Sequence, residues 1–253
     1  MERVTFKNSR NLTLVGNFRS ALSKSAIVLA HGFTSDKSSD GRFERLGESL
    51  HSIGYSVLAF DFSGCGESDN DILDIGHQID DLNSAISFVQ SEGAHAVGLH
   101  GHSLGSLICL KCFSPMISTM VLTGALIDGM QYNWSRFFAP EQVRQLDERG
   151  YLVATDRTGK ARKIGRQILE DFALIDQETL LQSVACPALI IHGNNPGDRE
   201  ELQLLERSRR GMKFLCPASR LEVIEGGNHG LREHYDKVVE LAKSWFLRHL
   251  PVY

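Results

Sequence analysis

A serine stands between two glycines in the pentapeptide GHSLG, which runs from Gly101 to Gly105. The segment before it, HAVGLH, has the composition of a buried strand, and the segment after it, SLICLKCF, has that of a helix. A G-x-S-x-G sequence at such a junction is typical of a nucleophile elbow, where the turn is too tight for larger side chains at the two glycine positions. The pattern therefore predicts that Ser103 is a nucleophile rather than an ordinary turn residue.

A nucleophilic serine needs a histidine as general base and a carboxylate that fixes the histidine. Among the ten histidines, His229 in EGGNHGL is the best placed, because it follows the last predicted strand at the same sheet edge as Ser103. The remaining histidines near strand ends are expected to have structural roles: His31, His100, His102 and His192.

Short apolar runs that read as buried strands recur along the chain, and they must supply the sheet that positions these residues. The runs are SAIVLA (25–30), YSVLAF (55–60), HAVGLH (95–100), STMVLTGAL (118–126), PALIIHG (187–193) and RLEVIEGG (220–227). Helical periodicity marks RFERLGESLHSIG, GHQIDDLNSAISFVQSEG, SLGSLICLKCF and the tail HYDKVVELAKSWFLRHL. The alternation predicts an α/β fold, a mostly parallel twisted sheet with helices on both faces.

The segment from Asp128 to Gln182 interrupts this alternation. In its stretch YLVATDRTGKARKI two alternating runs flank a D-R-T-G turn, which predicts a β-hairpin, and the helical pattern RQILEDFALID follows. We therefore expect a core of residues 1–127 and 183–253 and a lid insertion at 128–182, with structural padding as the alternative. Trp134 and Phe138 are candidates for the substrate pocket, unless the aromatic residues only pack the insertion onto the core.

Four motifs in order resemble those of the α/β-hydrolases: HGF at His31, DFSGCGES at Asp61, GHSLG, and GGNHG around His229. Within that superfamily the chain is most similar to small bacterial cinnamoyl or feruloyl esterase-like and serine aminopeptidase-like hydrolases. The resemblance implies a lid-bearing α/β-hydrolase fold and an oxyanion hole made by the backbone N–H groups of Phe33 and Leu104.

The acid of the triad is less clearly marked. In many members of the family it lies four residues beyond the histidine of an HG pair, and here that position is Pro196. Asp198 lies two residues further on in HGNNPGD, so a longer loop could deliver it, because the intervening residues are turn formers. We expect Asp198 to be the acid, with Asp128 after the preceding strand as the alternative, and Asp61 to be structural.

Composition limits the partners. The 27 basic and 31 acidic residues give a formal charge of −4, which argues against nucleic acid. No apolar run approaches the roughly 20 residues of a membrane span, and no signal peptide is recognisable. Five scattered cysteines, including the pair Cys109 and Cys112, are typical of a reduced cytoplasmic protein rather than of a metal site. We expect a soluble cytoplasmic protein with no metal or cofactor and no membrane partner; a homodimer stays open.

The leading hypothesis is a serine carboxylesterase that acts on a small-molecule ester through an acyl-enzyme. Triad chemistry does not select the leaving group, so a peptidase or thioesterase is the alternative among enzymes. A catalytically inactive α/β-hydrolase that serves as a binding module is the alternative from another class.

Overall fold

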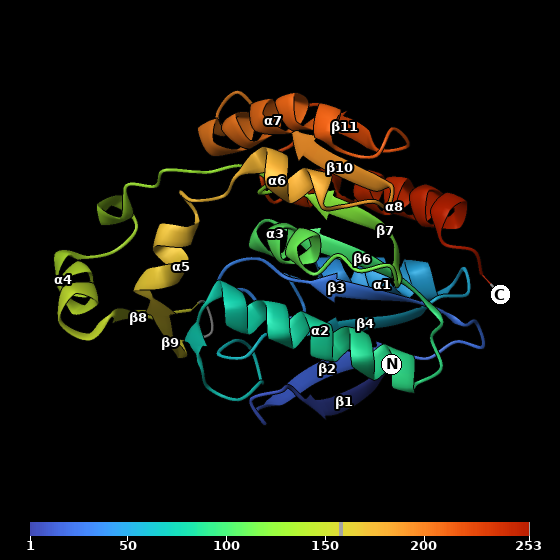
Figure 1. Cartoon of the computed structure of the whole chain (residues 1–253), viewed down its shortest axis with the longest axis horizontal. Coiled ribbons are helices and arrows are strands. Elements are labelled where there is room, and N and C mark those ends of the chain that lie inside the picture. Colours follow the sequence, from blue (N-terminus) through green and yellow to red (C-terminus); the bar gives the residue numbers. More distant parts are fainter. Residues whose placement is uncertain (157–158, 253) are drawn as a thin grey trace.

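The computed structural model describes residues 1–156 and 159–252 and is built on an eight-stranded sheet (Figure 1). The strand order is β1-β2-β4-β3-β6-β7-β10-β11. The strands are β1 (Glu2–Lys7), β2 (Thr13–Arg19), β3 (Ser25–Ala30), β4 (Ser56–Phe60), β6 (Ala96–His102), β7 (Ile117–Thr123), β10 (Ala188–Gly193) and β11 (Arg220–Ile224). β1 and β2, and β2 and β4, pair antiparallel, whereas every pair from β4 to β11 is parallel. The predicted mostly parallel α/β sheet is therefore confirmed.

Helices cover both faces of this sheet. One face carries α1 (Arg42–His51) and α8 (Tyr235–His249), and the other carries α2 (Ile75–Ser91), α3 (Leu104–Lys111), α6 (Gln177–Gln182) and α7 (Arg199–Gly211). In β3, Ala26 and Val28 join the core under α2 and α3, while Ile27 and Leu29 join the core under α1 and α8. Successive side chains of a strand point to opposite faces, so a strand covered on both sides is apolar throughout, as SAIVLA is.

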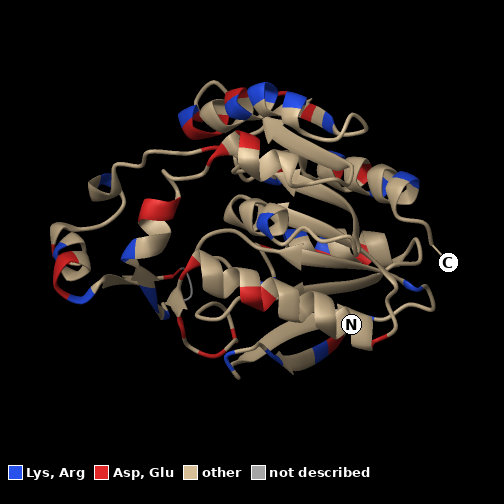
Figure 2. Cartoon of the chain, in the orientation of Figure 1, with Lys and Arg blue, Asp and Glu red and all other residues tan. Residues whose placement is uncertain are grey.

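α7 occupies residues to which the sequence analysis assigns no helix. It begins after Asp198, whose carboxylate accepts the backbone N–H of Glu201 at 3.1 Å, and it buries Leu204 and Leu205. Its outer face mixes both signs of charge, as Figure 2 shows at the top of the molecule. The arginines of the basic stretch RSRR (207–210) therefore lie on a helix surface that also carries acidic residues, and Arg209 lies 3.5 Å from Glu206.

Between β7 and β10 the chain leaves the sheet, and we call this segment the cap (residues 128–182); its last helix, α6, packs on the core beside α3 and α7. Its elements are η1 (Trp134–Arg136), α4 (Pro140–Arg149), β8 (Tyr151–Thr155), β9 (Ala161–Gly165), α5 (Arg166–Asp171) and α6. β8 and β9 pair antiparallel, and β5 (Ile72–Leu73) of the core extends them to a three-stranded sheet. Arg157 and Thr158, in the predicted D-R-T-G turn, lie outside the described residues. Figure 1 shows α4, α5, β8 and β9 of the cap at the left, on the side toward which β3 and β10 point, and α6 beside the core.

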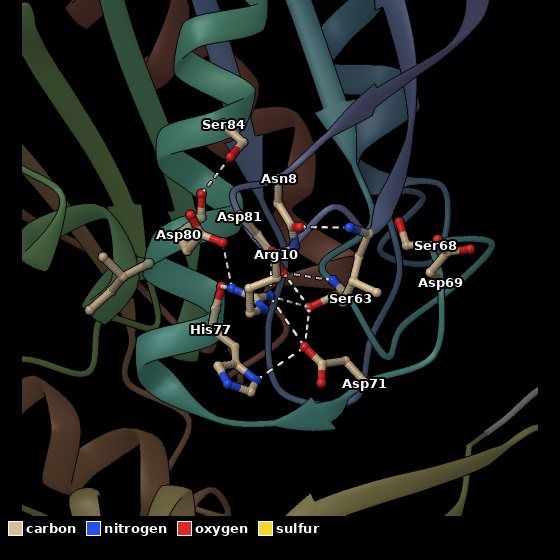
Figure 3. A network of polar contacts seen from close by, with 12 residues as sticks. Asn8, Arg10, Ser63, Ser68, Asp69, Asp71, His77, Asp80, Asp81 and Ser84 are labelled. Carbon is tan, nitrogen blue, oxygen red and sulfur yellow. Dashed lines mark hydrogen bonds and ion pairs between the residues drawn. The ribbon is translucent and has the colours of Figure 1, made fainter.

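A polar network fixes the turn of the N-terminal hairpin to the core (Figure 3). The Arg10 guanidinium lies 2.9 Å from Asp81, 3.2 Å from Asp71 and 2.5 Å from Asp80. Asp81 is fully buried on α2 and also accepts the Ser63 hydroxyl at 2.7 Å. Ser63 belongs to the DFSGCGES segment, so this network holds three separate parts of the chain together and leaves Ser63 in a structural role.

Candidate active site

Ser103 lies between β6 and α3 in a conformation that few non-glycine residues adopt, with φ 54° and ψ −121°. A Cβ atom at Gly105 would lie 2.2 Å from the carbonyl oxygen of Ala30, and one at Gly101 would lie 2.6 Å from that of Gly105. These approaches are closer than any side chain tolerates, so both glycines are required for the turn. The turn leaves the Ser103 hydroxyl partly exposed at the start of α3.

His229 lies on the loop after β11, and its Nε2 is 3.0 Å from the Ser103 Oγ. Two glycines allow this approach. Gly124, with φ 53°, would place a Cβ 2.8 Å from Cε1 of the imidazole, and a Cβ at Gly193 would lie 2.0 Å from the Gly227 carbonyl oxygen. The backbone at the carboxyl ends of β7 and β10 thus carries no side chain where the histidine loop passes it.

The carboxylate that meets the imidazole belongs to Glu201, a residue that the sequence analysis did not select. Its Oε2 lies 2.6 Å from His229 Nδ1, and its side chain is 0% exposed. Its Oε1 lies 2.8 Å from His192 Nδ1 and accepts the backbone N–H of Gly193 at 3.0 Å. Ser103, His229 and Glu201 therefore form one continuous chain of hydrogen bonds.

The prediction that Asp198 contacts the imidazole is wrong. Its Oδ2 accepts the main-chain N–H of His229 at 2.8 Å, and its Oδ1 caps α7 through the N–H of Glu201. Asp198 is close to His229, as the longer loop implied, but it contacts the backbone of His229. The carboxylate that contacts the imidazole ring is that of Glu201, one helical turn later. The alternative acid, Asp128, instead faces Arg207 and Arg210 at 3.7 and 3.8 Å.

Burial and charge act in opposite directions on the two titratable groups. Burial disfavours the imidazolium of His229, but the hydrogen bond and negative charge of Glu201 outweigh it and raise the pKa of His229. Burial would raise the pKa of Glu201, but its hydrogen bonds with His192 and His229 outweigh that effect and lower it. Glu201 is therefore ionised at neutral pH, and its charge favours a proton on His229.

His102, the second residue of GHSLG, lies beside this pair, with its ring centroid 5.2 Å from that of His229. Burial, with the nearby charges of His229 and Arg42, keeps the pKa of His102 well below its usual value, so no second imidazolium competes with His229.

The Arg42 guanidinium donates to the Gly230 carbonyl at 2.6 Å. Arg42 thereby fixes the loop that carries His229 against α1.

The HGF loop lies directly against the nucleophile. A Cβ at Gly32 would be 3.3 Å from the Cβ of Ser103, and Thr34 has a positive φ of 54°. Phe33 of this loop and Leu104, the first residue of α3, line the same cavity as Ser103. The two residues that the resemblance implies for an oxyanion hole therefore border the space beside the Ser103 hydroxyl.

A cavity of about 410 Å³ opens between the elbow and the cap. Its aromatic lining residues are Phe33, Tyr132, Trp134, Phe137, Phe138 and Phe172. These rings also contact one another, with centroids 4.8 Å apart for Tyr132 and Trp134 and 6.0 Å apart for Trp134 and Phe138. The two expectations for the aromatic residues are thus compatible, because the same rings pack the cap and line the cavity.

The cavity also has polar walls. The Tyr132 hydroxyl donates to Glu200 at 2.8 Å, and a buried ion pair joins Arg162 to Asp156 at 2.6 Å. Arg162 also donates to the Gly64 carbonyl at 2.7 Å, which connects the cap hairpin to the core.

Within the described ranges, 1–156 and 159–252, no three His, Cys, Asp or Glu side chains form a group that could ligate a metal ion. None of the helices in that part of the chain has the length and hydropathy needed to cross a membrane.

Comparisons with known proteins agree with this fold. The model of the alpha/beta hydrolase family matches residues 27–241. Est1E from Butyrivibrio proteoclasticus, solved with ferulic acid bound, superposes with a TM-score of 0.78 at 20% identity, covering 98% of this chain and 99% of that one. The Pyrococcus furiosus esterase PF2001 gives 0.75 at 20% identity over 98% and 91%, and the esterase domain of a Rhodothermus marinus protein gives 0.70 at 24% over 98% of each. No curated protein matches by sequence.

Proposed function

Because this chain belongs to the alpha/beta hydrolase family, we propose that it is a serine carboxylesterase with Ser103 as nucleophile, His229 as general base and Glu201 as the acid. One observation carries the proposal: hydrogen bonds of 3.0 and 2.6 Å join Ser103, His229 and Glu201 in series beside an open cavity. A carboxylic ester of a small molecule is the proposed substrate.

In the first half of the proposed reaction, the Ser103 oxygen attacks the ester carbonyl carbon while His229 Nε2 takes the hydroxyl proton. The carbonyl π electrons move to the oxygen, and the N–H groups of Phe33 and Leu104 would donate to that oxyanion. The positive end of the α3 dipole favours the same negative charge. When the intermediate collapses, His229 returns the proton to the leaving alcohol and the acyl group stays on Ser103.

In the second half, a water molecule replaces the alcohol. His229 takes a proton from the water as its oxygen attacks the acyl carbon, and the proton then returns to Ser103 as the carboxylic acid leaves. Glu201 stays ionised throughout, and it stabilises the imidazolium that forms twice in each cycle.

The pH dependence of kcat/KM tests the role of His229. The base must be neutral to accept the serine proton, so activity should rise with pH as the imidazolium deprotonates. Because Glu201 raises the pKa of His229, we expect the midpoint of this rise above the ordinary histidine value of about 6.5. Initial rates on a short ester between about pH 5 and about pH 9 measure it. A midpoint below the ordinary value would contradict the assigned electrostatics.

We propose that the cap selects the acyl or alcohol group, because its rings line the cavity that contains Ser103. The aromatic lining suits an aryl or other apolar group. Est1E, which shares the fold, was solved with an aromatic acid, ferulic acid, bound.

Removal of cap rings should change substrate preference more than basal turnover. For Trp134→Ala or Phe138→Ala we expect the preference between a bulky aryl or long-chain ester and an acetate ester to shift by on the order of tenfold. kcat/KM values for nitrophenyl esters of increasing length and for methyl ferulate measure the shift. Leu174→Ala, at an exposed position of the cap outside the cavity, is the matched control. Equal losses on every ester would identify the rings as packing residues only.

The alternatives share the fold but predict other assays. A peptidase would cleave an amino-acid anilide, which an esterase leaves intact. A thioesterase would cleave a thioester faster than the matching oxygen ester. An inactive binding module would hydrolyse none of them and would resist a fluorophosphonate probe, which labels activated serines. The full panel, run on the wild-type protein and on Ser103→Ala, distinguishes these functions.

A further inference from the structure

A second histidine contacts Glu201 on the side opposite His229. His192, the last residue but one of β10, lies with its Nδ1 2.8 Å from Glu201 Oε1, and both side chains are 0% exposed. The Gly193 N–H donates to the same oxygen at 3.0 Å, so among the described residues Oε1 has two donors and Oε2 has one, His229. The Glu201 carboxylate thus bridges two imidazoles.

The contacts of His192 suit one tautomer of its ring. An ionised carboxylate only accepts hydrogen bonds, so Nδ1 of His192 carries a proton. Its Nε2 lies 2.8 Å from the hydroxyl of Ser208, which is fully buried on α7. A hydroxyl can donate to that nitrogen, so the two contacts suit a neutral imidazole. A cationic His192 would neutralise the negative charge of Glu201, which stabilises the His229 imidazolium.

We propose that His192 is a positioning residue of the triad, which fixes the plane of the Glu201 carboxylate as a neutral donor without consuming its charge. The inference rests on the proposed function. Glu201 reaches His229 from the first turn of α7, through a longer and more rotatable side chain than an aspartate. Two donors from β10 restrict that rotation, so the sheet, rather than the helix alone, aims Oε2 at His229.

Two amide substitutions separate the two ends of the His192 ring. The amide nitrogen of His192→Asn can occupy the place of Nδ1 and donate to Glu201, whereas that of His192→Gln reaches the place of Nε2, toward Ser208. We expect kcat to remain within about fivefold of wild type for His192→Asn and to fall about 10- to 100-fold for His192→Gln, with little change in KM. A packing role predicts the opposite order, because glutamine is closer than asparagine to histidine in volume.

Proton NMR supplies a readout that does not depend on activity. A short hydrogen bond to an ionised carboxylate should give His229 Nδ1–H a far-downfield resonance. We expect that resonance in the wild type and in His192→Asn, and its loss or upfield shift in His192→Gln. Equal resonances and equal kcat in the two variants would overturn the proposal. Failure of the wild type to hydrolyse any ester would instead overturn the proposed function. The resonance does not depend on activity, so it would still report the contact between Glu201 and His229.

Ser208→Ala tests the tautomer without changing the ring. Removal of the hydroxyl leaves His192 Nε2 without its donor, so we expect kcat to fall by a factor of about three to ten, with wild-type KM. Unchanged kcat together with an unchanged His229 resonance would overturn the assignment of His192 as a neutral donor.

Discussion

Ser103→Ala is expected to abolish ester hydrolysis and to leave the fold nearly unchanged. The hydroxyl is the proposed nucleophile, and its loss removes the covalent pathway, which in comparable triads costs on the order of 10⁶-fold in turnover. The fold should persist because the residue is partly exposed and its hydroxyl makes a single-point contact, the 3.0 Å hydrogen bond to His229. Initial rates on a short nitrophenyl ester and a thermal melt measure the two effects.

A fluorophosphonate probe supplies the control for this experiment. It should label the wild-type protein at Ser103 and should not label the alanine variant. Ser87→Ala, which removes an exposed hydroxyl on α2, should retain both labelling and turnover. Ester hydrolysis at an undiminished rate by Ser103→Ala would exclude the covalent mechanism.

Much of the fold could be predicted from the sequence because its signals are local. The buried strands are continuous apolar runs, and SAIVLA forms β3 over the same six residues. The elbow could be predicted because the turn has no room for side chains at Gly101 and Gly105. Carbonyl oxygens would lie 2.6 and 2.2 Å from Cβ atoms at these two positions. Such features depend on neighbours in sequence or on one close approach.

The acid could not be predicted in the same way, because Glu201 lies on α7, beyond the loop that follows β10. One signal was available: Asp198 and Glu201 form a D-x-x-E pattern, in which an aspartate caps a helix and a glutamate lies in its first turn. Asp198 Oδ1 accepts the N–H of Glu201, and this hydrogen bond caps the N-terminus of α7. The helix pattern alone does not set the inward direction of Glu201. That direction also depends on β10, whose His192 and Gly193 hydrogen-bond to the Glu201 carboxylate.

The cavity could not be predicted from the sequence either. The interrupted strand–helix alternation predicts only where an insertion lies, whereas the cavity arises between residues far apart in sequence. Phe33 from the core and Phe172 from the cap meet with ring centroids 5.8 Å apart. Which aromatic residues face a substrate is therefore set by the docking of the cap on the sheet.

Glu201→Gln is expected to lower turnover by about 10⁴-fold while the protein stays folded. The remaining amide oxygen can still accept the donors of His192 and Gly193, which leaves the amide nitrogen facing His229. An N–H in that position can donate only to an unprotonated Nδ1, so the imidazole would carry its proton on Nε2. His229 could then no longer accept the proton of Ser103, and it would also lose the charge that stabilises its imidazolium.

Asp198→Asn is the matched control, because it makes the same chemical change three residues earlier. Its amide oxygen can still cap α7, and the variant loses the charged acceptor of the His229 main-chain N–H, an interaction worth about 1.5 kcal/mol. We expect a loss of turnover of at most about tenfold, since that free energy is close to one decade in rate. Assays of both variants on one short ester at neutral pH compare them. Collapse of activity in Asp198→Asn with near-normal activity in Glu201→Gln would return the role of the acid to Asp198, because the charge that stabilises the imidazolium would then come from the loop and not from the helix.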